Sequence, residues 1–114
     1  MTPTQLFKAL SDNTRLRCLC MLVSAEELCV CELTHATGLA QPKVSHHLAA
    51  LRKAGLVSDR KQGLWIYYRI NEQLPSWAID VIRTAAEGIR GQEPFIRDVD
   101  ALAEMNNRKE GLCG

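Results

Sequence analysis

The feature that most restricts the fold is a short helix followed at once by a β-hairpin. The helix opens with Pro42, a residue suited to a first helical turn, and ends at Gly55. Two strand-like runs follow, residues 56–61 and 64–70, with residues 62–63 as the tight turn between them. A hairpin in this position predicts a wing.

A second short helix is expected just before this unit, over residues 31–37. Leu33 and Ala36 point inward at helical spacing, and Gly38 supplies the left-handed residue that stops a helix. Two short helices joined by a glycine turn predict a helix-turn-helix. The expected fold class is therefore mainly α with a β-hairpin, a winged helix-turn-helix.

Helices are also expected on both sides of this unit. Thr2 and Gln5 fit a capping box at the start of the first helix. The second helix has a core-facing stripe of Leu16, Leu19, Cys20 and Val23, with Cys18 off the stripe. Cys18 and Cys20 are interpreted as small buried apolar residues and not as ligands.

Two further helices are expected after the hairpin. The stripe from Ala78 to Ile89 suits close contact between helices, so the terminal helices are expected to form a homodimer interface and not only to cover the monomer core. Residues 1–107 would then be one DNA-binding and dimerisation domain, and residues 108–114 a flexible tail.

Composition and the first residues of the chain indicate in which cellular compartment the protein is expected. With 114 residues, 46% of them hydrophobic, the chain suits one domain, and no apolar run approaches the ~18 residues of a membrane span. Residues 1–5 lack the order of an export signal, so a cytoplasmic location is expected. In that reducing compartment the five cysteines are expected to be thiols and not a disulfide framework.

Positive charge is concentrated around the predicted reading helix and wing. Residues 43–69 carry six Lys or Arg and one acid, a charge of +5, whereas the remainder carries eight basic and twelve acidic residues, a charge of −4. Such a segregated basic face indicates binding to double-stranded DNA. The expected DNA-binding residues are Gln41, Lys43, Ser45, His46, His47, Arg60 and Lys61. Of these, His47 is expected to be half-buried and hydrogen-bonded.

The Cys29-Val30-Cys31 sequence places two soft sulfur ligands one residue apart. On an α-helix, residues i and i+2 point about 200° apart, whereas in extended backbone they point the same way. Chelation by both sulfurs therefore requires the start of the third helix to unwind. Because the neighbouring helix reads DNA, a bound thiophile would lower DNA affinity by linkage.

These segments resemble the ArsR family of winged-helix metalloregulatory repressors, in particular its arsenic-responsive branch. The resemblance is carried by residues 6–16, Glu27–Leu33, Gln41–Leu48 and Asp59–Gly63. It implies a homodimer that represses an arsenic-resistance operon and leaves its operator when trivalent arsenic or antimony binds Cys29 and Cys31. No other cofactor is implied.

Two positions depart from the family pattern. A third cysteine is usual three residues after the pair, where this chain has Thr34, and arginine is common at the position of His46. The third metalloid ligand is then Cys113 or a small thiol or other non-protein group. The inducer is arsenite, antimonite or a methylated arsenical.

Other classes of function are also considered. A thiol-based redox-sensing repressor would use Cys29 and Cys31, or one of them with Cys113. An enzyme is not expected, because the sequence has no phosphate loop, nucleophile elbow or acid pair. DNA release by arsenite under reductant distinguishes the metalloid sensor from the redox sensor.

Overall fold

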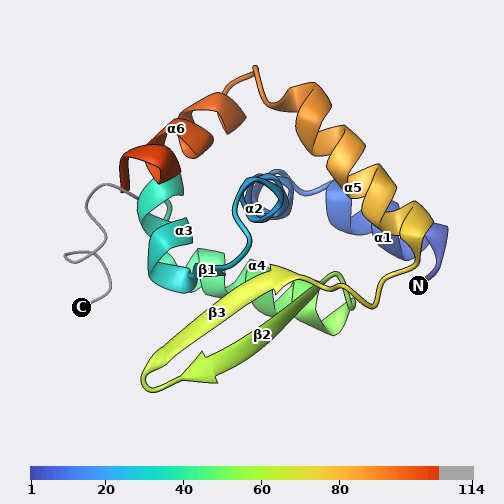
Figure 1. Ribbon diagram of the computed structural model, residues 1–114, viewed down its shortest axis with the longest axis horizontal. Coiled ribbons are helices and arrows are strands. Elements are labelled where there is room, and N and C mark those ends of the chain that lie inside the picture. Colours follow the sequence, from blue (N-terminus) through green and yellow to red (C-terminus); the bar gives the residue numbers. More distant parts are fainter. Residues whose placement is uncertain (106–114) are drawn as a thin grey trace.

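The computed structural model describes residues 1–105; the expected tail and Cys113 lie outside them. These residues form six helices and a small sheet, which are arranged as Figure 1 shows. In chain order these are α1 (Pro3–Leu10), α2 (Asn13–Ser24), β1 (Leu28–Cys29), α3 (Val30–Thr37), α4 (Gln41–Lys53), β2 (Val57–Gln62), β3 (Trp65–Ile70), α5 (Ser76–Ile89) and α6 (Phe95–Met105). The winged helix-turn-helix predicted from the sequence is confirmed.

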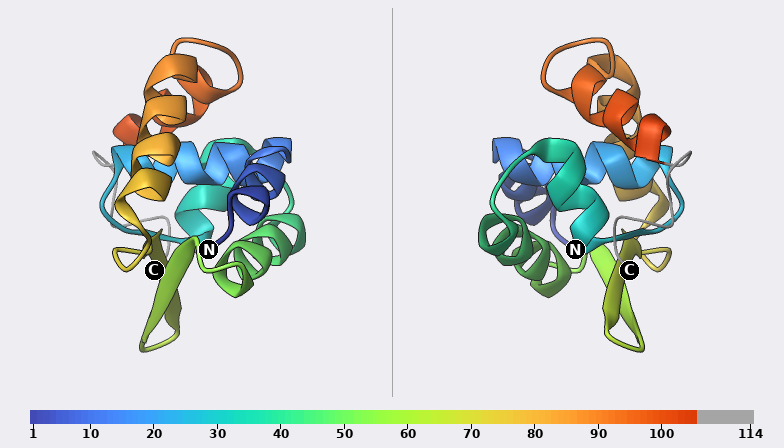
Figure 2. Two further views of the ribbon diagram at one scale, coloured as in Figure 1. Left: turned by 90° about the vertical axis from the view of Figure 1, so that its right-hand side faces the viewer. Right: turned by 90° about the vertical axis from the view of Figure 1, so that its left-hand side faces the viewer.

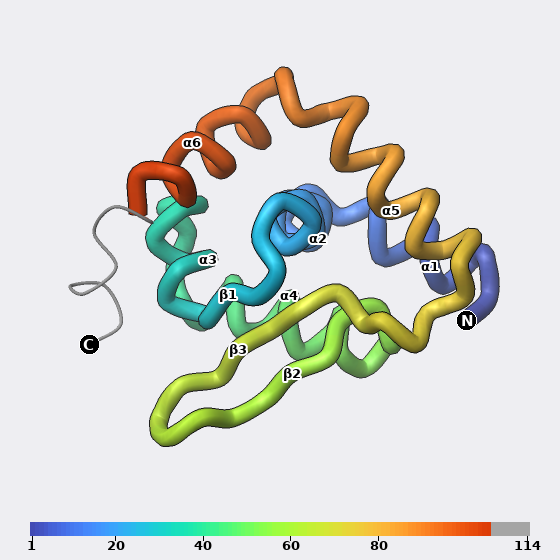
Figure 3. The backbone as a smooth tube through the Cα atoms, in the orientation of Figure 1, coloured from blue at the N-terminus to red at the C-terminus, as the bar shows by residue number. Residues whose placement is uncertain are grey.

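Helix α2 is the centre of the core. Figure 3 shows it nearly end on, surrounded by the other elements, and it contacts every other helix and β3. Residues 17–22 are all buried, whereas Leu16 and Val23 are only partly covered. The buried surface of α2 is therefore wider than the single core-facing stripe expected from the sequence, because other elements pack on several sides of this helix. Cys18, which lies off that stripe, is fully buried.

The helix ends follow the local signals. Thr2 caps α1 in the expected capping box. Gly38 ends α3 with φ 71°, and Gly55 follows α4 with φ 84°. Beyond Gly55, the Leu56 N–H donates to the Leu51 carbonyl at 3.0 Å, which is a Schellman stop. These stops set the angle between α3 and α4 and the entry into the wing.

The wing is an antiparallel hairpin that projects from the helical body (Figure 2). Gln62 pairs with Trp65, so the loop is residues 63–64 and not the expected 62–63. Gly63 has φ 61° and stands first in the loop, as a type II′ turn requires. The glycine therefore decides the register, and Leu64 becomes an exposed turn residue.

A third strand, β1, was not predicted. It has two residues and joins the free edge of β3, which gives the strand order β1-β3-β2. Leu28 pairs with Tyr68 and Cys29 pairs with Tyr67. The segment just before α3 is thus part of the wing sheet.

The last two helices pack on the core. Helix α5 contacts α2 and buries Ala78, Ile82 and Ala86, while Ala85 and Ile89 are only partly buried. Helix α6 contacts α2 and α3. Much of the expected dimerisation stripe therefore covers the protomer's own core. Across residues 1–105, no helix combines the length and apolar character needed to cross a membrane.

Candidate functional site

Cys29 lies at the junction between β1 and α3. It is the N-cap of α3, with extended backbone at φ −85° and ψ 163°. Its N–H donates to Glu32 Oε1 at 2.9 Å, and its sulfur accepts the Glu32 N–H, so a thiol takes the place of the usual hydroxyl in a capping box. Burial raises the pKa of Cys29 to about 11. The sulfur is therefore a protonated helix cap at neutral pH.

Cys31 is the second residue of α3 and is partly buried. It is disulfide-bonded, which differs from the expectation that all cysteines are thiols. Cys18 and Cys20 are thiols inside the core, where burial raises their pKa values to about 12 and about 11. Such buried thiols are poor nucleophiles and ligands, which agrees with their interpretation as core residues.

The backbone at Cys29 reduces the rearrangement that chelation requires. Helix α3 begins at Val30, one residue before the expected Cys31, but Cys29 itself already has extended backbone. Only the first turn of α3 has to open for the two sulfurs to point the same way. That opening removes the hydrogen bonds that Cys29 and Glu32 exchange at the helix start.

Thr34 stands one turn after Cys31 in α3. Its Oγ1 is buried and has no hydrogen-bond partner among the described residues. A hydroxyl is a hard donor and a poor substitute for a thiolate toward a soft metalloid. The described part of the chain also contains no group of three His, Cys, Asp or Glu side chains that could hold a metal ion.

The segment before Cys29 is tied to the wing by an ion pair. Arg60 donates to Glu27 through Nε at 2.8 Å and through Nη2 at 2.6 Å, and this contact holds the pKa of Glu27 below its usual value. The Arg60 guanidinium also lies 4.7 Å from the centroid of the Tyr67 ring. Arg60 was expected to reach DNA. Its contact with DNA remains a prediction, and it would require this pair to open.

The outer face of α4 presents most of the expected DNA-reading residues. Gln41, Lys43 and His46 are exposed, and Ser45 is partly buried. In the wing, Lys61 is exposed on β2. These side chains lie on the two elements that a winged helix offers to a DNA groove and its flanking backbone.

His47 is turned inward, as expected. Its Nδ1 accepts a hydrogen bond from Arg15 Nε at 3.1 Å and lies 3.7 Å from Asp12 Oδ1. Burial lowers the pKa of His47, although the charge of Asp12 opposes the shift. A neutral imidazole therefore fastens α4 to the start of α2, and contact of His47 with DNA remains a prediction.

A buried ion pair was missed by sequence reasoning. Arg17 donates to both Asp98 oxygens at 2.8 Å and to the Thr37 carbonyl at 3.0 Å, so α2 and α6 are joined to the end of α3. The only sequence signal was Asp98 itself. It lies between Phe95 and Leu102 on the apolar side of its helix, where an acid needs a partner.

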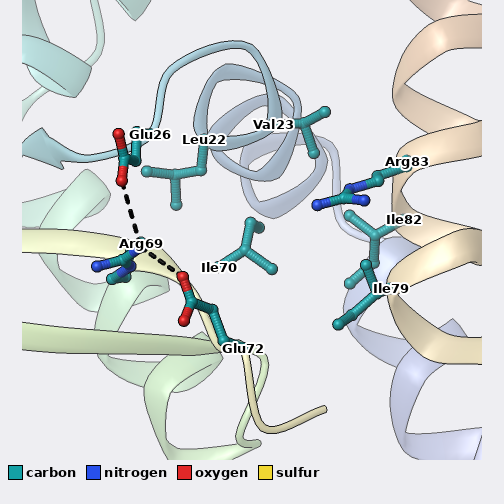
Figure 4. A pocket seen from close by; sticks show the side chains of 9 residues that line it. All are labelled: Leu22, Val23, Glu26, Arg69, Ile70, Glu72, Ile79, Ile82 and Arg83. Carbon is teal, nitrogen blue, oxygen red and sulfur yellow. Dashed lines mark hydrogen bonds and ion pairs between the residues drawn. The ribbon is translucent and has the colours of Figure 1, made fainter. Parts of the chain in front are cut away.

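Two cavities lie near the wing, and they differ in chemistry. One, of about 170 Å³, is enclosed by α2, α5 and the base of β3 (Figure 4). Beside it, Arg69 pairs with Glu72 and lies 3.6 Å from Glu26. No cysteine lines this cavity.

The other cavity has a volume of about 260 Å³ and is lined by the cysteine pair, the start of α4 and the tip of the wing. Its lining residues are Cys29, Val30, Cys31, Gln41, Ser45, Leu64, Trp65 and Ile66. Both candidate sulfur ligands thus share a cavity with the start of α4 and the tip of the wing. Sequence spacing could not show this arrangement, since the wing residues are more than thirty positions from the cysteines.

Comparison with known proteins agrees with this architecture. Residues 12–59 match the family described as "Bacterial regulatory protein, arsR family". The chain is 44% identical over 110 residues to the arsenic resistance transcriptional regulator ArsR1 of Pseudomonas putida, covering 96% of this chain and 84% of that protein. It is 49% identical over 85 residues to the arsenical resistance operon repressor of Escherichia coli, covering 75% and 73% of the two chains.

A solved structure of a known repressor has the same fold. The crystal structure of the AntR antimony-specific transcriptional repressor superimposes with a TM-score of 0.63 at 30% sequence identity. The match covers 75% of this chain and 74% of that one.

Proposed function

The chain belongs to the arsR family of bacterial regulatory proteins, and we propose that it represses arsenic-resistance genes until trivalent arsenic or antimony releases it from DNA. One observation carries the assignment of the sensing site: Cys29 is both the N-cap of the first helix of the helix-turn-helix and the partner of Tyr67 in the wing sheet. A metalloid bound there would act on both DNA-reading elements at once.

The proposed ligands are Cys29 and Cys31, with Cys113, a small thiol or another non-protein group as the third donor. Binding requires both thiols in reduced form, and it exchanges the cap of α3 for bonds between sulfur and the metalloid. Loss of the first turn of α3 moves the start of the helix that packs against α4. Strain at Cys29 also reaches the wing through β1 and the Glu27–Arg60 pair.

The free energy needed for release is modest. A hundredfold loss of DNA affinity corresponds to a coupling of about 2.7 kcal/mol between the two sites. Opening one helical turn and breaking its capping bonds is of that order, since a single cap contributes about 1 kcal/mol. The coupling is reciprocal, so operator DNA should weaken metalloid binding by the same factor.

A homodimer is part of the proposal, because two reading helices about 34 Å apart match a two-fold operator. The exposed apolar side chains Phe7 on α1 and Trp77 on α5 support a dimer surface on this pair of helices. Ile82, by contrast, is only 2% exposed within the protomer. A charge at Ile82 would therefore disrupt the core and would not test the interface.

The experiment is a titration of the protein on its promoter DNA with arsenite and antimonite. A phosphine reductant keeps Cys31 as a thiol and offers no competing sulfur. Release by metalloid under these conditions is the expected result. Release by oxidant only, with no response to metalloid, would replace this function with the redox-sensing repressor, for which the disulfide at Cys31 is the supporting observation.

A further inference from the structure

We propose that Leu64, at the tip of the wing, inserts as an apolar wedge between two base pairs in the minor groove of the operator. The inference rests on the proposed function, since it takes operator binding through α4 and the wing as its premise. It adds a DNA contact that involves neither charge nor a hydrogen bond. It also adds a preference for a flexible base step under the wing, which phosphate contacts of the basic residues cannot provide.

Leu64 is the second residue of the hairpin loop and is 91% exposed. No other large apolar side chain of residues 1–105 is more than 56% exposed. The turn itself does not require leucine, because the positive φ of this loop is at Gly63. Trp65 and Ile66 follow and are also exposed, so three consecutive apolar residues face solvent at the tip. Packing within the protomer therefore does not explain Leu64, and a contact with another molecule does.

The charge around the tip favours DNA as that molecule. Residues 60–71 include Arg60, Lys61 and Arg69 and no acidic residue. Lys61 is exposed and stands opposite Ile66 in the hairpin. The ion pairs formed within residues 1–105 do not include Lys61. An apolar tip beside an unpaired cation is complementary to a minor groove, where phosphates flank base steps that accept apolar wedges.

The tip also lies beside the helix that is expected to read the major groove. Leu64 lines the same cavity as Gln41 and Ser45 at the start of α4. Figure 1 shows the hairpin extending from the helical body to a free loop. With α4 in the major groove, this loop meets the neighbouring minor groove, which is about 6 Å wide and about 7.5 Å deep. A loop of two residues, one of them glycine, can enter that groove with a single side chain.

A leucine side chain has no polar atom with which to read a base edge, so its contribution to specificity comes from the deformability of DNA. Apolar wedges partly unstack a base step and bend the duplex. The TA and CA/TG steps are the most easily unstacked. The wing should therefore select operators that have such a step in each half-site, at the position that the loop reaches.

The first measurement compares Leu64→Ala with Leu64→Met on promoter DNA. Leu64→Ala should weaken operator binding about tenfold, because an inserted leucine side chain is lost, whereas the apolar and similarly sized methionine should bind as the parent does. The salt dependence of binding should stay unchanged in both. Lys61→Ala is the matched control, since it should lower that dependence. Full affinity of Leu64→Ala, or equal weakening by Leu64→Met, refutes the wedge.

The second measurement uses 2-aminopurine, whose fluorescence rises when it unstacks, placed in turn at each TA and CA/TG step of the operator. The parent and Leu64→Met should raise the fluorescence at one symmetric pair of steps, and Leu64→Ala should not. The absence of a rise with the parent, or the same rise with Leu64→Ala, overturns the proposal. A change in the mass of the free protein on Leu64→Ala also overturns it, because the tip would then contact a second copy of the chain.

The outcomes are separate from those that test metalloid sensing. Leu64→Ala leaves Cys29 and Cys31 in place, so arsenite should still release this variant from DNA. If arsenite does not release the parent while the 2-aminopurine signal depends on Leu64, the metalloid sensor is wrong and the wedge stands. If arsenite releases the parent and the signal is absent, the wedge is refuted and the proposed function stands.

Discussion

Arg17 and Asp98 form a bidentate ion pair inside the protein, with Asp98 only 1% exposed. The pair connects α2 to α6, and the Arg17 contact with the Thr37 carbonyl carries the connection to the end of α3. The C-terminal helix is thereby held against the helix-turn-helix. Removing the ion pair should therefore lower the stability of the whole domain and not only that of one helix.

Asp98→Ala should lower the free energy of unfolding by about 3–5 kcal/mol, because it leaves the Arg17 charge buried without its partner. Urea denaturation followed by circular dichroism measures the change. Glu72→Ala, which removes an exposed partner of Arg69, is the control and should cost no more than about 1 kcal/mol. Equal effects of the two substitutions would contradict the structural role of the buried pair.

Cys29→Ser and Cys31→Ser should each retain DNA binding and lose release by arsenite, since each removes one of the two proposed ligands. Cys113→Ser should change the metalloid concentration needed for release only slightly. Fluorescence anisotropy of labelled operator DNA measures both properties. An inducible Cys31→Ser protein, or an uninducible Cys113→Ser protein, would mean that the sensing site is assigned wrongly.

Lys43→Ala and Lys61→Ala should both weaken operator binding, because these exposed side chains lie on α4 and on the wing. If each removes one phosphate contact, the slope of log affinity against log salt should fall by about 0.9. Lys8→Ala, an exposed cation on α1, should leave the slope unchanged. Binding that responds equally to all three substitutions would indicate a general charge effect and no winged-helix docking.

His47 should make stability depend on pH. Burial lowers its pKa below the usual 6.5, so the unfolded chain takes up a proton that the folded chain resists. The contribution of His47 to the free energy of unfolding is complete above about pH 6.5, and it is lost as the pH falls through the lowered pKa. His47→Gln should therefore show a smaller drop in the urea midpoint between about pH 7.5 and about pH 5.5 than the parent. His35→Gln, at an exposed position on α3, should behave as the parent does.

Trp77→Glu, alone or with Phe7→Glu, should give a folded monomer with weaker operator binding, because both apolar side chains are exposed in the protomer. Sedimentation velocity measures the mass, and circular dichroism checks that the protomer stays folded. Leu64→Glu, an exposed apolar side chain in the loop of the wing and on none of the helices, is the control for the mass. A dimer that survives both substitutions would place the interface elsewhere.

The sequence by itself determined the helices, their ends and the fold class. Caps and stops are local, because Thr2 bonds within its own first turn and glycine adopts the positive φ of residues 38 and 55 without a steric penalty. Helical periodicity placed His47 on the flank of its helix, where it was expected to be half-buried and hydrogen-bonded, and the structure confirms this. The prediction of an arsenic-responsive repressor came from the family resemblance, in which Cys29-Val30-Cys31 is one of the matching segments.

Only the tertiary structure decided how the segment from Glu27 to Cys31 is connected to the wing and to the other helices. Arg17 and Asp98 are 81 residues apart, and Glu27 and Arg60 are 33 apart, so no local period relates them. Strand β1 exists because β3 offers it a hydrogen-bonding edge, which two residues could not reveal on their own. The shared cavity likewise forms only when the wing folds beside the cysteines. Such contacts depend on packing between distant segments, and a sequence pattern describes only what each segment favours locally.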